Sequence, residues 1–107
     1  MKNPDLGMDN PAQGLPSALH IVVAGKVRRV GFRRFAKQSA DRLGLTGWVR
    51  NRRQGEVEIQ AVGEKRLLEA FLARIREGPK SAIIQEISVH WLEADQPYRH
   101  FRIRWFG

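Results

Sequence analysis

The fold is decided by residues 19–33, which read LHIVVAGKVRRVGFR. The first six of these residues are an apolar run typical of a buried strand, and Gly25 ends the run. From Phe32 onward, apolar side chains recur at the spacing of an amphipathic helix, and Gly44 stands where a helix C-terminal glycine belongs. We therefore expect a strand over residues 19–25 and a helix over residues 32–43, joined by a short loop.

The rest of the chain continues the alternation of strands and helices. We expect strands at residues 46–51 and 56–62, a helix over 64–77, a strand over 84–92 and a short strand over 101–105. The order β-α-β-β-α-β predicts an α+β, ferredoxin-like sandwich, in which two helices cover one face of a mainly antiparallel sheet. Residues 18–107 form this domain, and the proline- and glycine-rich residues 1–17 are expected to be a disordered leader.

Composition excludes several classes of protein. The chain has 107 residues and no cysteine, so it forms one domain without a disulfide, a thiol nucleophile or a thiolate metal site. No apolar run approaches the ~18 residues of a membrane span, and the N-terminal residues lack the apolar core of a signal peptide. The expected location is therefore the cytoplasm. His20, His90 and His100 lack the paired spacing of metal ligands, so we expect no metal and no other cofactor.

Positive charge gathers around two predicted loops. The formal net charge is +8. Much of it comes from two segments, with Lys26, Arg28, Arg29, Arg33 and Arg34 in the first and Arg50, Arg52 and Arg53 in the second. If these loops are neighbours, the protein has one strongly positive end, which suits a small phosphorylated molecule as well as it suits nucleic acid.

The loop between the first strand and the first helix has the features of a phosphate site. Such a loop points several backbone N–H groups the same way, and the helix macrodipole lies behind them. Arg33, on the first helical turn, can hold a phosphate with two N–H donors. Asn51 ends the second predicted strand. If that strand end approaches the loop, both side chains converge on one anion.

Several motifs, taken together, resemble the acylphosphatase family. They are Gly25-Lys26-Val27-x-x-Val30-Gly31-Phe32-Arg33, Gly44-Leu45-x-Gly47-Trp48-Val49-Arg50-Asn51, Gly55-x-Val57-Glu58, Gly78-Pro79 and the closing Tyr98-x-x-Phe101-x-Ile103. The resemblance covers nearly all of residues 19–105. It implies a hydrolase acting on acid anhydrides, which splits the carboxyl-phosphate bond of small acyl phosphates into carboxylate and inorganic phosphate without a metal.

The resemblance also implies a role for each site residue. Arg33 would hold the phosphoryl group, and Asn51 would orient the attacking water. The backbone N–H groups of the loop would cradle the phosphate oxygens; its residues are Lys26, Val27, Arg28, Arg29, Val30 and Gly31. This division of labour is physically sound, because the carboxylate is a good leaving group and the reaction mainly needs positioning and charge stabilisation. We expect the protein to act as a monomer.

Two positions depart from the family pattern. The family typically has Gln-Gly where this chain has Arg28-Arg29. Glycine adopts a positive φ easily, whereas a left-handed conformation costs any other residue about 1–2 kcal/mol. Either Arg29 takes that conformation, or the loop has a different shape. Arg52 is the second departure, since a small polar residue is expected after the asparagine.

Two other functions remain open. A non-catalytic basic module of the same fold would bind nucleic acid or phosphorylated ligands. Such modules usually expose aromatic residues on central strands, whereas Glu56, Glu58 and Gln60 face outward on the third strand, so we do not expect nucleic acid as a partner. The three tryptophans, Trp48, Trp91 and Trp105, are expected to pack in the core or against the sheet.

The third possibility is an acylphosphatase-like domain of a carbamoyl-transfer or hydrogenase-maturation protein. Such domains normally belong to much longer chains that carry zinc-finger cysteines. This sequence has no cysteine.

Overall fold

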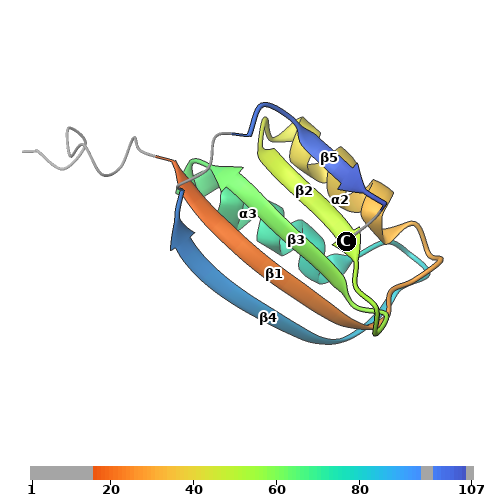
Figure 1. The fold of residues 1–107 in the computed structure, drawn as a ribbon. Coiled ribbons are helices and arrows are strands. Elements are labelled where there is room, and N and C mark those ends of the chain that lie inside the picture. Colours follow the sequence, from red (N-terminus) through yellow and green to blue (C-terminus); the bar gives the residue numbers. More distant parts are fainter. Residues whose placement is uncertain (1–15, 95–97, 106–107) are drawn as a thin grey trace, which may run out of the picture.

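The computed structural model describes residues 16–94 and 98–105, and its elements follow the predicted order (Figure 1). They are β1 (Ser17–Lys26), α2 (Phe32–Arg42), β2 (Thr46–Asn51), β3 (Val57–Gly63), α3 (Lys65–Glu77), β4 (Ile83–Glu93) and β5 (Phe101–Arg104). Every predicted element is present, and small shifts affect only its ends. The predicted leader lies outside the described residues except for Pro16 and Ser17, and Ser17 already belongs to β1.

The five strands form one mixed sheet in the order β4-β1-β3-β2-β5. Neighbouring strands are antiparallel except for β2 and β5, which are parallel. Both helices lie on the same face of the sheet (Figure 1). The prediction of a ferredoxin-like α+β sandwich is confirmed. Because β3 is antiparallel to both β1 and β2, the strands β1, β2 and β5 all run in the same direction.

The core lies between the sheet and the helices. On β3, Val57, Ile59 and Ala61 are fully buried, as their alternation with polar residues predicts. The facing helices bury apolar side chains at the predicted spacing, namely Phe32, Ala36 and Ala40 of α2 and Leu68, Phe71 and Ile75 of α3. Within the described part of the chain, neither helix is long and apolar enough to cross a membrane.

The opposite face of the sheet carries a polar network that joins its three central strands. The Glu58 carboxylate on β3 accepts hydrogen bonds from Arg50 Nε on β2 and from His20 Nε2 on β1, each at 2.7 Å. Partial burial by itself would raise the pKa of Glu58. The hydrogen bonds from His20 and Arg50 outweigh this effect, so the pKa of Glu58 lies below its ordinary value.

Glu58→Gln tests this network. The neutral amide loses both charge-assisted bonds, so at about pH 7 the free energy of unfolding should fall by about 1 kcal/mol. A lowered folded-state pKa stabilises the fold above the unfolded-state pKa of about 4.3, and this stabilisation is lost as pH falls through the folded-state pKa. Urea unfolding should therefore show the difference between wild type and variant shrinking toward acidic pH. A difference that widens on acidification would contradict this account.

Candidate active site

A cavity opens where the ends of β1, β2 and β5 meet the start of α2. Its volume is about 350 Å³. Its lining residues are Val27, Arg29, Gly31, Phe32, Arg33, Arg34, Asn51, Ile103 and Trp105. Three separate segments of the chain therefore contribute to one small site.

The loop that begins this site is held at both ends. β1 enters it through an irregularity in its pairing with β4, between Ala24 and Gly25. Gly25 has a φ of 134°, and a Cβ there would collide with the backbone carbonyl of Ile83, so the two strands approach this closely only with glycine. Val27 and Phe32, at either end of the loop, are 1% and 2% exposed and pack in the core. The core therefore fixes both ends of the loop backbone between Val27 and Phe32.

Arg29 has a φ of 60°, so it takes the left-handed conformation in which the family typically has glycine. This answers the question that the sequence left open. The conformation costs a non-glycine residue about 1–2 kcal/mol, and the anchored loop ends hold Arg29 in it. Residue 29 therefore has a positive φ, which glycine adopts easily, and Arg29 lines the cavity.

Arg33 and Asn51 line the same cavity, because the end of the second strand approaches the loop. Arg33 is half-buried on the first turn of α2, and Asn51 is the last residue of β2. The N-cap of α2 is Gly31, with a φ of 77° and no side-chain cap, and the first helical turn holds no acidic residue. The positive end of the helix macrodipole is therefore left without a neutralising carboxylate from its own turn.

The remaining residues of the predicted cradle divide into two groups. Val27, Arg29 and Gly31 line the cavity, while Lys26 and Arg28 are exposed and Val30 packs against the core. The Arg28 side chain reaches the β2–β3 turn beside Gly55. Arg52, the second departure from the family pattern, pairs with Glu56 at 3.3 Å within that same turn.

Trp105 is one of the site residues that sequence reasoning missed. It was expected to pack in the core or against the sheet, but it is 66% exposed, and the Arg33 guanidinium carbon lies 4.2 Å from its ring centroid. This is a cation–π contact. Phe32, Arg34 and Ile103 also line the cavity without having been assigned to it. No local pattern could reveal Trp105, because its position follows from the pairing of β5 with β2.

The cavity is suited to an anion. Arg29, Arg33 and Arg34 line it, and no carboxylate does so among the residues that the structure describes. Within the same residues, no group of three or more His, Cys, Asp or Glu side chains is placed to hold a metal ion. The arrangement therefore offers guanidinium groups and a helix N-terminus to a small, negatively charged ligand.

Two substitutions of Arg29 test the left-handed loop. Arg29→Gly and Arg29→Ala both remove the guanidinium. The positive φ at this position remains unfavourable for alanine but not for glycine. We expect the glycine variant to be more stable than the alanine variant by about 1 kcal/mol in urea unfolding. Equal stability, or a more stable alanine variant, would show that residue 29 does not hold a positive φ in solution.

Comparison with known proteins agrees with this geometry. The family model for acylphosphatases matches residues 19–103. An acylphosphatase from Marinobacter nauticus is 45% identical over 83 residues, which cover 78% of this chain and 90% of that protein. The crystal structure of acylphosphatase from Bacillus subtilis superimposes with a TM-score of 0.80 at 35% identity, over 82% of this chain and 98% of that one.

A longer protein also contains this fold. Full-length HypF matches with a TM-score of 0.74 and 33% identity, over 83% of this chain but only 12% of HypF. The Marinobacter and Bacillus proteins, in contrast, are matched over most of their own length. The resemblance first seen in the motifs is confirmed by sequence and by structure, and the chain belongs to the acylphosphatase family.

Proposed function

We propose that the cavity at the ends of β1, β2 and β5 is where the chain hydrolyses acyl phosphates, and that Arg33 and Asn51 carry out the chemistry. One observation supports this proposal above all others. An arginine from the start of α2 and an asparagine from the end of β2 line a single small cavity, together with a loop in which Arg29 has a positive φ.

Binding comes first in the proposed mechanism. The two terminal N–H groups of Arg33 donate to two oxygens of the phosphoryl group, and backbone N–H groups of residues 27–31 and of the first turn of α2 donate to the others. Arg29 and Arg34 add positive charge at the rim. These donors are in place before the reaction, so they stabilise charge on the phosphoryl oxygens without reorganising.

Water attack follows. The Asn51 side-chain oxygen accepts a hydrogen bond from a water molecule and holds it in line with the bond to be broken, without itself titrating. The water oxygen forms a bond to phosphorus while the bond from phosphorus to the acyl oxygen breaks, and the carboxylate leaves. The proton released by the water passes to a phosphate oxygen of the substrate. No protein base is needed, and no metal is needed to neutralise the phosphoryl charge.

Trp105 acts in this proposal as a positioning residue. Its ring lies against the Arg33 guanidinium, so it limits the orientations that this flexible side chain can take before the substrate arrives. Trp105 directly follows β5, and Arg33 lies at the start of α2; these two elements are joined where Lys37 Nζ donates to the Phe101 carbonyl at 3.0 Å. The arginine therefore meets its ligand already oriented.

The substrates we propose are small acyl phosphates, with acetyl, carbamoyl and glyceroyl phosphates as candidates. The cavity of about 350 Å³ leaves room for a phosphate and a short acyl group. We also propose that the protein works as a monomer in the cytoplasm. One chain supplies both Arg33 and Asn51, so no second copy is required to complete the site.

The first test is hydrolysis of a chromogenic acyl phosphate in the presence of EDTA. Wild type should be active, and Arg33→Ala should lower kcat by roughly 100- to 1000-fold, the usual effect of removing one donor to a transition-state oxyanion. Asn51→Ala should lower kcat comparably with a smaller change in KM, because it acts on the water rather than on the phosphate. Arg33→Lys should recover little, since an ammonium group lacks the two-pronged geometry.

The control is Arg76→Ala, which removes an exposed arginine on α3 and should leave kcat unchanged. Circular dichroism establishes that each variant is folded. Full activity in folded Arg33→Ala or Asn51→Ala would refute the assigned roles, and activity lost on adding EDTA to wild type would refute the metal-free mechanism.

Trp105 is tested by comparing Trp105→Ala with Trp105→Phe. Loss of an exposed cation–π contact costs about 0.5–1 kcal/mol, so the alanine variant should bind inorganic phosphate, measured as a competitive inhibitor, about two- to fivefold more weakly. Phenylalanine keeps an aromatic face and should recover part of this affinity. Phosphate binding that is equal in all three proteins would show that Trp105 does not position Arg33.

A further inference from the structure

A second hollow lies on the open face of the sheet, beside β2 and β5. Its volume is about 810 Å³, and its lining residues are Gly47, Trp48, Tyr98, Arg99, His100, Arg102 and Arg104. It shares no residue with the cavity that contains Arg33 and Asn51. The two are therefore separate sites, and an inference about this one does not depend on the proposed catalytic mechanism.

Alternate side chains of β5 and of the residue after it line different sites. Successive side chains of a strand point to opposite faces of the sheet. Ile103 and Trp105 accordingly line the first cavity, while Arg102 and Arg104 line the second hollow. Substitutions at Arg102 can therefore change the open face without touching the residues assigned to hydrolysis.

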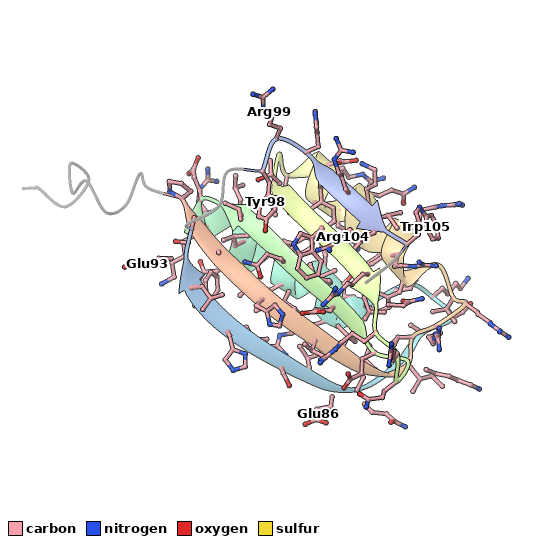
Figure 2. The ribbon with its side chains drawn as sticks, viewed as in Figure 1. Glu86, Glu93, Tyr98, Arg99, Arg104 and Trp105 are labelled. Atoms are coloured by element: carbon pink, nitrogen blue, oxygen red, sulfur yellow. The ribbon has the colours of Figure 1, made fainter. Side chains whose placement is uncertain are left out.

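The second hollow is strongly basic. Arg99, Arg102 and Arg104 line it together with His100, and among the described residues no carboxylate does so. Glu58, the carboxylate of β3 on this face, is engaged by Arg50 and His20 at 2.7 Å. The exposed acid Glu86 lies on β4, at the other edge of the sheet from Arg99 (Figure 2). Charge on this face is therefore polarised toward β5.

Two aromatic residues line the same hollow as these arginines. Trp48 and Tyr98 are half-buried. The Trp48 indole N–H donates a hydrogen bond of 3.4 Å to the Tyr98 phenolic oxygen. The guanidinium carbons of Arg104 and Arg50 lie 4.8 and 5.1 Å from the Trp48 ring centroid. Aromatic rings and guanidinium planes are the surfaces on which unpaired bases stack.

The aromatic residues of this surface do not lie on the strand where the sequence analysis looked for them. Nucleic-acid-binding domains of this fold usually expose aromatic residues on central strands, and the third strand carries Glu56, Glu58 and Gln60 on its outward face instead. The structure places the aromatic residues on β2 and just before β5 instead, and Glu58 is hydrogen-bonded to Arg50 and His20. Half-buried aromatic residues therefore line this face of the sheet, toward its β5 edge.

We propose that this hollow binds single-stranded nucleic acid. Arg99 and Arg102 contact successive phosphates, and bases stack against the surface formed by Trp48 and Tyr98. Single strands are favoured over duplexes, because the bases of a duplex are stacked on one another and present only their edges in the grooves.

The test is binding of a short fluorescein-labelled oligouridylate, followed by anisotropy at about 50 and about 200 mM salt. Saturating inorganic phosphate is present throughout, so that the cavity around Arg33 is occupied. Arg99→Ala/Arg102→Ala should bind at least tenfold more weakly than wild type. The dependence of log K on log salt should become shallower by about 1.4, since each phosphate contact on a single strand contributes about 0.7.

The matched control is Arg42→Ala/Arg76→Ala, which removes the same charge from exposed positions on α2 and α3, on the opposite face. It should bind nearly as tightly as wild type. Tyr98→Ala should weaken binding severalfold while leaving the salt dependence unchanged, because stacking involves no ion release. Both double variants should hydrolyse a small acyl phosphate at the wild-type rate.

Four results would overturn the proposal. The Arg99/Arg102 variant binding as tightly as wild type would exclude these phosphate contacts. An equal loss in the Arg42/Arg76 control would show attraction by net charge alone. Equal affinity for a duplex of the same length would exclude base stacking. Loss of hydrolysis in the folded Arg99/Arg102 variant would show that the two sites are not separate.

Discussion

The site depends on one topological constraint, which is that β1, β2 and β5 run in the same direction. β3 is antiparallel to both β1 and β2, and β5 is parallel to β2. The C-terminal ends of β1, β2 and β5 therefore lie at the same end of the sheet. The loop that follows β1, Asn51 at the end of β2 and Trp105 after β5 therefore meet there. Helix α2 begins at that end of the sheet, so Arg33 lines the same cavity.

Packing then holds a group of like charges close together. Arg29, Arg33 and Arg34 line one cavity, and the left-handed backbone at Arg29 adds an unfavourable energy of about 1–2 kcal/mol. Buried Val27 and Phe32 fix the loop ends, so the free energy of the core maintains a conformation that the loop would not adopt alone. A site assembled in this way is complete before its anion arrives, which is what electrostatic stabilisation of phosphoryl transfer requires.

Much of this was predictable from the sequence, and the exceptions have physical reasons. Alternation on β3, the apolar spacing of both helices and the glycines at their ends predicted every element. The sequence predicted that Arg33 and Asn51 converge only if the end of the second strand approaches the loop. The contact between Trp105 and Arg33 was not predictable, because the pairing of β5 with β2 joins residues about fifty positions apart in sequence. The backbone of Arg29 was also undetermined, since its own preference is against a positive φ and only its buried neighbours enforce it.

The central claim is that the protein directs water to phosphorus at a site built by Arg33 and Asn51. The most direct measurement is hydrolysis of an acyl phosphate in water labelled with heavy oxygen, with EDTA present, followed by mass spectrometry of both products. Attack at phosphorus places the label in inorganic phosphate and leaves the carboxylate unlabelled. Label in the carboxylate would show attack at the acyl carbon, and it would contradict the role given to the water beside Asn51.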